Sequence, residues 1–184
     1  MIINPRTAIK EGWITGIVDQ EKQIQPNAID FTLDRLFHVS FNNFIICVDP
    51  DTNKETKQMR GGSENLTVND RRTGVDFFHI EGKTSYDAMS DVFVTIPEGV
   101  AALLITRSSY NRNSIFLTSG LYDSGFSNNI GFTLHNMSPG QAKIQKGMCV
   151  GQIIFIEAGT SHLYTGVYNQ KPGEHHLEIV GKNK

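Results

Sequence analysis

The chain has 184 residues, of which 39% are hydrophobic, so it is long enough to bury one sizeable core, and a single domain spanning residues 1–184 is expected. A formal net charge of −2 argues against a surface that binds a nucleic acid polymer, and without an apolar leader or a membrane-length apolar run we expect no membrane association. Cys47 and Cys149 lie far apart and have no partner at metal-ligand spacing, which indicates buried thiols in a reducing compartment and hence a cytoplasmic protein.

The N-terminal segment 5–20 is predicted to contain one short helix. Pro5 suits the first helical turn, and apolar residues follow at helical spacing (Ala8, Ile9 and Trp13). We expect Gly12 or Gly16 to end this helix.

From Ile29 onward the apolar residues form short runs rich in Ile, Val, Phe and Thr. Gly, Asn, Asp or Pro separate the runs, which is typical of short strands between turns. The runs are IDFTL (29–33), FNNFIICV (41–48), VDFFHI (75–80), DVFVTI (91–96), VAALLI (100–105), SIFL (114–117), NIGFTL (129–134) and GQIIFI (151–156). They predict an all-β fold, either an antiparallel barrel or a sandwich.

The stretch 49–74 interrupts this pattern because it is almost entirely polar and contains Gly61 and Gly62. We predict a long surface excursion, either a loop or a hairpin. The Gly-Gly-Ser sequence within it does not lie between a strand and a helix, so it does not indicate a phosphate-binding loop.

The segment 106–136, TRSSYNRNSIFLTSGLYDSGFSNNIGFTLHN, contains the residue types of a phosphate site with a base. Arg107, Ser108, Ser109 and Arg112 offer guanidinium and hydroxyl donors that match phosphate oxygens. Asp123 lies on a glycine-flanked turn, where a carboxylate is able to orient and deprotonate a water. Short motifs of this kind also occur by chance in loops, so the spacing alone leaves catalysis open.

The same segment resembles the second and third motifs of the family that unites the homotrimeric dUTPases with the dCTP deaminases. Flanking matches extend the resemblance from about Gln25 to Gln170. It implies a distorted antiparallel β-barrel of the β-clip or jelly-roll-like type, with a short N-terminal helix. It also implies a homotrimer with sites between subunits, and a magnesium ion held mainly by the triphosphate of the substrate.

The resemblance assigns roles around the phosphates. Gln25 to Leu33, QPNAIDFTL, is similar to the first motif as deaminases have it, so Asp30 is expected near the metal-bound phosphates, acting through water. A strand-end carboxylate capping backbone amides is the structural alternative for Asp30. Arg107, Ser108 and Ser109 are the expected phosphate ligands. The roles of two further residues stay open: Arg112 binds phosphate or forms a subunit-interface ion pair, and Gln152, in the fourth-motif segment GMCVGQIIF, binds phosphate or lies on the wet face of a strand.

The third motif assigns roles around the nucleoside. Gly120, Leu121 and Tyr122 are expected to hold the pyrimidine through a hairpin backbone. Asp123 is expected to activate the water that attacks the α-phosphorus. Phe126 is expected to pack on the deoxyribose, although a core aromatic is the alternative.

Thr133 distinguishes the two branches of the family. In the deaminases a glutamate at this position moves protons during water attack on cytosine, and a hydroxyl with a pKa far above neutral cannot replace it. The stretch 129–136 instead resembles that of dUTPases, with His135 as a strand residue rather than a catalyst. A carboxylate from elsewhere beside Thr133 would overturn this argument.

The tail, 164–184, lacks the glycine-rich fifth motif of trimeric dUTPases and resembles the deaminase tail that covers the nucleotide. Tyr168 and Gln170 are its expected contacts, Val167 replaces a lysine, and Lys171 is a candidate substitute. His175 and His176 are expected to be solvated.

Together these features predict a dUTP diphosphatase that forms dUMP and pyrophosphate with magnesium. One alternative is a dCTP-directed enzyme, either a deaminase with a displaced acid or a triphosphatase. The other is a non-catalytic nucleotide-binding protein of the same fold.

Overall fold

The computed structural model describes residues 1–39, 46–48, 55–57, 62–64, 67–159, 162–166 and 168–169. Within this part of the chain, short antiparallel strands dominate and the helices are limited to α1 (Pro5–Lys10), α2 (Gln20–Gln23) and α3 (Ser108–Asn111). None of these helices has the length and apolarity needed to cross a membrane. The predicted all-β class with a short N-terminal helix is therefore confirmed.

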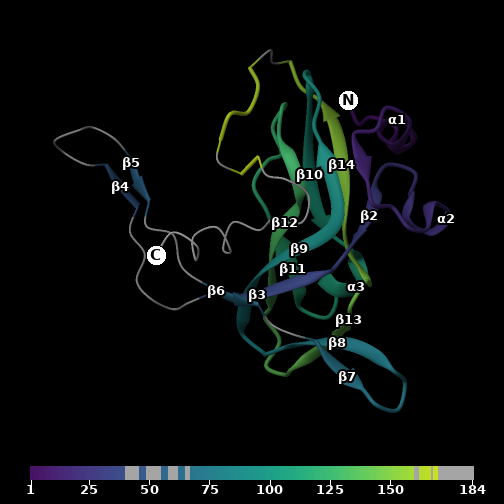
Figure 1. Cartoon of the computed structure of the whole chain (residues 1–184), viewed down its shortest axis with the longest axis vertical. Helices are drawn as coiled ribbons and strands as arrows, with labels where there is room; N and C mark the ends of the chain where they lie inside the picture. The colour runs from purple at the N-terminus through teal and green to yellow at the C-terminus, as the bar shows by residue number, and fades with distance from the viewer. Residues whose placement is uncertain are drawn as a thin grey trace.

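The strands follow one another along the chain with few helical interruptions (Figure 1). They are β1 (Ile14–Thr15), β2 (Ile29–Thr32), β3 (Arg35–Val39), β4 (Ile46–Val48), β5 (Glu55–Lys57), β6 (Gly62–Glu64), β7 (Val68–Asp70), β8 (Val75–Ile80), β9 (Thr84–Thr95), β10 (Val100–Thr106), β11 (Ile115–Thr118), β12 (Ser127–Asn136), β13 (Ala142–Gln145) and β14 (Cys149–Glu157). The apolar runs predicted β2, β4, β8, the second half of β9, β10, β11, β12 and β14, whereas β1, β3, β13 and the first half of β9 fall outside those runs.

The strands form separate sheets rather than a closed barrel. The largest has the order β11-β12-β9-β3-β6, and β1 pairs with the C-terminal end of β9. A second sheet has the order β10-β14-β2. Two smaller sheets are β13-β8-β7 and the β4-β5 pair. All of these pairings are antiparallel, whereas the barrel closure implied by the resemblance is not formed by the described strands.

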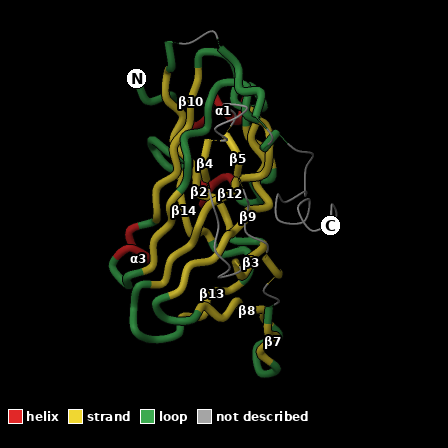
Figure 2. The backbone as a smooth tube through the Cα atoms, turned by 90° about the vertical axis from the view of Figure 1, so that its left-hand side faces the viewer, coloured by secondary structure: helices red, strands yellow, loops and turns green. Residues whose placement is uncertain are grey.

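The core lies between the two larger sheets, whose long strands run side by side along the molecule (Figure 2). On β12 buried and part-buried residues alternate, as expected for a strand with one face against a core. Phe31 of β2 and Phe132 of β12 pack together with ring centroids 5.3 Å apart. The other face of each sheet is therefore available for a functional site.

Helix α1 forms as predicted for local reasons. Pro5 occupies the start of the helix, and the Asn4 side chain accepts a hydrogen bond from the backbone N–H of Arg6 at 2.9 Å. The helix ends at Lys10, and Gly12 follows in the left-handed region at φ +71°.

Parts of the predicted excursion 49–74 form strands. Strand β5 pairs with β4, β6 pairs with β3 and so forms the edge of the largest sheet, and β7 pairs with β8. The remainder up to residue 66 lies outside the described residues.

Candidate active site

Three strands of the second sheet place the expected phosphate-binding residues beside one another. Gln152 on β14 lies directly opposite Asp30 on β2 and opposite Ile105 on β10, two residues before Arg107. Gln152 Nε2 donates to Asp30 Oδ1 at 2.7 Å, and Arg107 Nε lies 3.3 Å from Asp30 Oδ2. Asp30 is therefore a buried carboxylate with a partner on each oxygen, and it does not cap backbone amides.

Arg107 connects this cluster to solvent. Its Nη1 donates to the carbonyl of Cys149 at 3.1 Å, while its side chain remains 37% exposed against 3% for Asp30. Burial, and secondarily the Asp30 charge, raises the pKa of the Cys149 thiol, which argues against a reactive thiolate. The guanidinium is thus fixed on one side by Asp30 and Cys149 and open on the other.

Ser108, Ser109 and Arg112 lie next to this open side but in solvent. Ser108 and Ser109 form the first turn of α3, and Arg112 follows its last residue. All three are exposed, and within the described chain no carboxylate pairs with Arg112. Arg112 therefore forms no ion pair with the described residues, and both of its expected roles, phosphate binding and a subunit-interface ion pair, stay open.

The turn that contains Asp123 is held rigidly against β10. Tyr122 and Ala102 exchange backbone hydrogen bonds of 2.9 and 3.0 Å, and the Ser124 hydroxyl donates to the carbonyl of Val100 at 2.6 Å. Tyr122 and Ser124 are buried, whereas Asp123 between them is exposed. Among the described residues none donates a hydrogen bond to the Asp123 carboxylate. Asp123 thus combines a fixed backbone with an unoccupied carboxylate.

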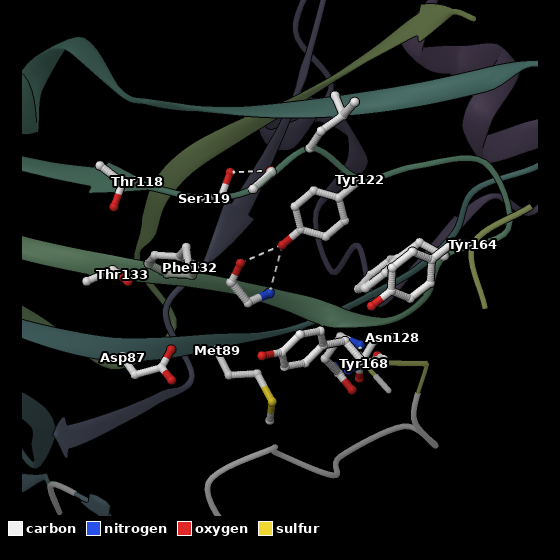
Figure 3. Close-up of a pocket in the computed structure, with 15 residues that line it drawn as sticks. Asp87, Met89, Thr118, Ser119, Tyr122, Asn128, Phe132, Thr133, Tyr164 and Tyr168 are labelled. Carbon is white, nitrogen blue, oxygen red and sulfur yellow. Dashed lines mark hydrogen bonds between the residues drawn. The ribbon is translucent and has the colours of Figure 1, made fainter. Parts of the chain in front are cut away.

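A cavity of about 520 Å³ opens beside this turn, within the range of small-molecule sites (Figure 3). Its floor is the outer face of β9, β12 and β11, and its walls are the Asp123 turn and the tail. The lining residues are Asp87, Met89, Thr118, Ser119, Gly120, Leu121, Tyr122, Phe126, Asn128, Asn129, Gly131, Phe132, Thr133, Tyr164 and Tyr168.

Tyr122 supports one wall of the cavity. Its phenol donates to the carbonyl of Gly131 at 2.5 Å and accepts from the Gly131 N–H at 3.0 Å. Burial raises the pKa of this phenol, and the negative charge of Asp87 raises it further. Tyr122, which was expected to contact the nucleoside, therefore connects the turn to β12 through these two hydrogen bonds.

One end of the cavity is polar. Thr118, Thr133 and Asp87 are consecutive cross-strand partners on β11, β12 and β9, so their side chains share one face of the sheet. Figure 3 shows the three residues at the same end of the cavity. The argument that no acid lies near Thr133 is therefore wrong for this chain, and Thr133 no longer distinguishes a dUTPase from a deaminase. Asp87 belongs to no motif, and only the polar alternation of 84–90 hinted at it.

The other end of the cavity is aromatic and is completed by the tail. Phe126 packs against Tyr122 and Tyr164 with ring centroids 4.8 and 5.7 Å away. Gly125 is required there, because its φ is +86° and a Cβ would come within 2.9 Å of Leu163. Phe126 is half-buried and contacts both the core and the cavity, and its packing on a deoxyribose stays a prediction.

Asn169 fastens the tail to the turn after Asp123. Its Oδ1 accepts from the backbone N–H of Ser127 at 2.8 Å, and its Nδ2 donates to the carbonyl of Gly125 at 3.1 Å. The Asn128 side chain donates to the carbonyl of Tyr168 at 2.9 Å. These contacts place Tyr168 over the cavity. Gln170, Val167, Lys171, His175 and His176 lie outside the described residues.

The structure thus gathers most of the expected residues into two groups. Asp123 lies on the turn beside the cavity without lining it, and Ser108, Ser109 and Arg112 are exposed and outside both groups. Gly120, Leu121, Tyr122, Phe126 and Tyr168 line the cavity, together with Asp87, Asn128 and Tyr164, which the sequence did not single out. The cluster of Asp30, Arg107 and Gln152 contributes nothing to the lining of this cavity. Among the described residues no group of three or more His, Cys, Asp or Glu side chains forms a metal site.

Comparisons with known proteins identify the family of the chain. The family model described as dCTP deaminase-like matches residues 5–158. A Bifidobacterium animalis subsp. lactis protein named "dCTP deaminase, dUMP-forming" is 31% identical over 156 residues, covering 83% of this chain and 75% of that protein. A Methanothermobacter thermautotrophicus protein named a probable deoxyuridine 5'-triphosphate nucleotidohydrolase is 24% identical over 152 residues, covering 83% of this chain and 91% of that protein.

A solved structure of 2'-deoxycytidine 5'-triphosphate deaminase from Agrobacterium tumefaciens has a similar fold. Its TM-score is 0.59 at 15% sequence identity, over 84% of this chain. The present chain spans about half (47%) of that deaminase chain. The family-model match over most of the sequence and the 31% identity establish that this chain belongs to the dCTP deaminase-like family.

Proposed function

We propose that this protein is a dUTP diphosphatase, which hydrolyses dUTP to dUMP and pyrophosphate in deoxynucleotide metabolism. The observation that supports it best is Asp123, an exposed carboxylate between two buried neighbours on the turn whose residues 120–122 line a nucleoside-sized cavity. A carboxylate without an intramolecular partner is available to accept a proton from water. Because its backbone is already fixed, little orientational freedom remains to be lost when the carboxylate and the water take up the reactive geometry.

Phosphate binding is assigned to the guanidinium, hydroxyl and amide donors at the ends of β10 and β14. Arg107 offers the face that Asp30 and Cys149 do not occupy, and Ser108 and Ser109 follow it in solvent. Gln152 Nε2 already donates to Asp30, so its second amide hydrogen is the one for a phosphate. Arg112 is a further candidate because it is exposed.

Asp30 is proposed as the positioning residue of this group. Its two oxygens accept from Gln152 and pair with Arg107, so it fixes both donors before a ligand arrives. A magnesium ion, when bound to the triphosphate, would neutralise phosphate charge. Asp30 fits a contact to that ion through water, since its lone pairs exceed its two protein partners and direct coordination would displace them.

The nucleoside is assigned to the cavity. Phe126 and Tyr168 lie at its aromatic end and suit the apolar faces of a deoxyribose, with Gln170 as a further predicted contact. The turn 120–122 supplies backbone groups beside the ring. The reaction takes place where sugar and phosphates emerge from this end of the cavity, next to Asp123.

A homotrimer with shared sites is proposed because Asp30, Arg107 and Gln152 do not line the cavity that the described residues form beside the Asp123 turn. The outer face of the β10-β14-β2 sheet exposes Leu103 and Ile105, each 42% accessible, beside the Asp30 cluster. Exposed apolar side chains on a strand face favour a covered surface. A neighbouring chain that covers it would bring its own Asp123 turn to this phosphate cluster.

Product analysis tests the assignment directly. The purified protein is incubated separately with dUTP and with dCTP in the presence of Mg²⁺, and nucleotides and pyrophosphate are quantified. The proposal expects dUMP and pyrophosphate in equal amounts from dUTP. Intact dUTP after long incubation with the folded protein would refute it.

A dCTP-directed enzyme is the second candidate, and Asp87 is the observation that favours it. The carboxylate lies opposite Thr133 in the cavity, where a displaced acid would have to be. In the same assay this candidate predicts ammonia release from dCTP with dUTP or dUMP as product. A dCTP triphosphatase predicts dCMP without ammonia.

A further inference from the structure

We infer that Asp87 and Thr133 recognise the substituent on carbon 4 of the pyrimidine ring, and that Asp87 makes the cavity bind a 4-aminopyrimidine more tightly than a 4-oxo one. This inference rests on the proposed function in one respect, namely that the cavity holds a pyrimidine deoxynucleotide. In the choice of ring it supports the dCTP-directed second candidate rather than dUTP. It assigns ring selection to a residue of β9 rather than to the Asp123 turn.

The floor of the cavity places the two side chains next to each other. Asp87 and Thr133 are direct partners in the β9-β12 ladder, and Met89 and Gly131 form the next pair on the same face. Directly opposite residues have Cβ atoms roughly 4.5 to 5.5 Å apart, close enough to contact one ring substituent together. Gly131 leaves open space above the floor, since a Cβ there would meet nothing within 4 Å. A flat ring has room to lie over Gly131 with its edge toward Thr133.

The two ends of the cavity determine which edge of the ring reaches these residues. In Figure 3 Tyr164 lies at the end opposite Asp87, whereas the Tyr168 ring lies between that end and Met89. Phe126 packs against Tyr164 with the two rings tilted by 60°. A deoxyribose held by these aromatic side chains places the glycosidic nitrogen at their end. Carbon 4 lies across the ring from that nitrogen, so its substituent points to Thr133 and Asp87.

The chemistry of a carboxylate then discriminates between the rings. An ionised Asp is only an acceptor, and the exocyclic amine of cytosine is a donor, so the two form a charge-assisted hydrogen bond. Uracil has a carbonyl oxygen at this position, which repels the carboxylate. The hydroxyl of Thr133 is able to donate or accept and therefore serves either ring. The charge of Asp87 also acts on a residue that lines the cavity, because it raises the pKa of the Tyr122 phenol.

The first test uses the unaltered protein and imido analogues that resist hydrolysis. Calorimetry measures the dissociation constants of the α,β-imido analogues of dCTP, of dUTP and of the matching 2-pyrimidinone nucleotide, which has no substituent on carbon 4. The inference expects the cytosine analogue to bind at least tenfold more tightly than the other two. Equal affinity for the cytosine and 2-pyrimidinone analogues would overturn it.

The second test changes Asp87 to Asn, because an amide also donates a hydrogen bond to a carbonyl oxygen. We expect the ratio of cytosine to uracil affinity to fall at least tenfold. Asp91→Asn is the matched control. It is on the same strand and changes the same charge, but it lies outside the cavity, where the Thr32 hydroxyl donates to its Oδ1. An unchanged ratio in a folded Asp87→Asn protein would contradict the inference, as would an equal change in the control.

The outcomes separate the inference from the proposed function. If no analogue binds the unaltered protein, the nucleotide site itself is wrong. If dUTP is hydrolysed but neither the analogue series nor Asp87→Asn alters ring preference, only the role of Asp87 is wrong. If Asp87→Asn does not fold, the analogue series on the unaltered protein still decides.

Discussion

The Asp30 cluster and the cavity, proposed to bind the phosphates and the nucleoside, differ in how their polar groups are satisfied. In the cluster, Asp30 already has a partner on each carboxylate oxygen, and Arg107 also donates to a backbone carbonyl. Beside the cavity, Asp123 has an exposed carboxylate without a partner among the described residues. The polar groups of the first region already hold one another, whereas the carboxylate of Asp123 beside the second is open to solvent.

This difference predicts which property each substitution changes. Where side chains hold one another, as around Asp30, removing one leaves a buried charge without its partner and lowers stability. Where a group is exposed and unpaired, as at Asp123, its removal costs little stability and affects the reaction. The predictions below compare the two regions on this basis, and the largest effect comes first.

Asp123→Asn is expected to lower kcat for dUTP by about 10² to 10⁴-fold, the usual contribution of a general base. The amide keeps the size of the side chain but does not accept a proton from water. Steady-state kinetics measures the loss, and calorimetry with the imido analogue of dUTP is expected to show affinity within threefold of the parent. A variant with the parent kcat would refute the role of Asp123.

Arg107→Ala is expected to lower the free energy of unfolding by about 2 to 3 kcal/mol, because Asp30 stays buried without its cationic partner. Arg112→Ala is the matched control, since Arg112 is exposed and should change stability by less than about 0.5 kcal/mol. Urea unfolding measures both. Equal destabilisation by the two substitutions would mean that the cluster is not held by its ion pair.

Tyr122→Phe is expected to cost about 1 to 2 kcal/mol, because the Gly131 N–H and C=O lose their phenol partner. The pKa of this phenol is raised above its ordinary 10.0, so the unfolded state loses the proton first as pH rises. Parental stability should therefore fall above about pH 10, by up to about 1.4 kcal/mol per pH unit.

The Phe variant should show a smaller fall over the same interval. Burial also raises the pKa of Tyr110, which is retained in the variant, so part of the slope should remain. Urea unfolding at a series of pH values measures the difference. Identical slopes would mean that Tyr122 does not stay protonated in the folded protein.

Asn169→Ala is expected to produce the smallest effect. The substitution removes the exposed hydrogen bonds that fasten the tail to Ser127 and Gly125. We expect KM for dUTP to rise severalfold while stability changes by less than about 1 kcal/mol. Kinetics and urea unfolding separate the two quantities. A large loss of stability would show that the tail is part of the folded core rather than a cover of the cavity.

Much of the local structure was predictable from short-range patterns. Apolar runs between turn residues predicted β2, β8, β10, β11, β12 and β14, and Pro5 with Gly12 predicted α1. The same patterns placed Arg107 at the end of a strand and Asp123 on a turn. These features depend on residues within a few positions of one another, so local sequence is sufficient to define them.

The tertiary structure alone decided which side chains meet. Gln152 bonds to Asp30 across 122 positions, and Asp87 lies opposite Thr133 although no motif joins them. Alternation along a strand indicates which face a side chain occupies, but the cross-strand register determines its neighbour, and a register depends on how distant strands pack. The carboxylate beside Thr133 is therefore a consequence of the β9-β12 pairing, which no single segment encodes.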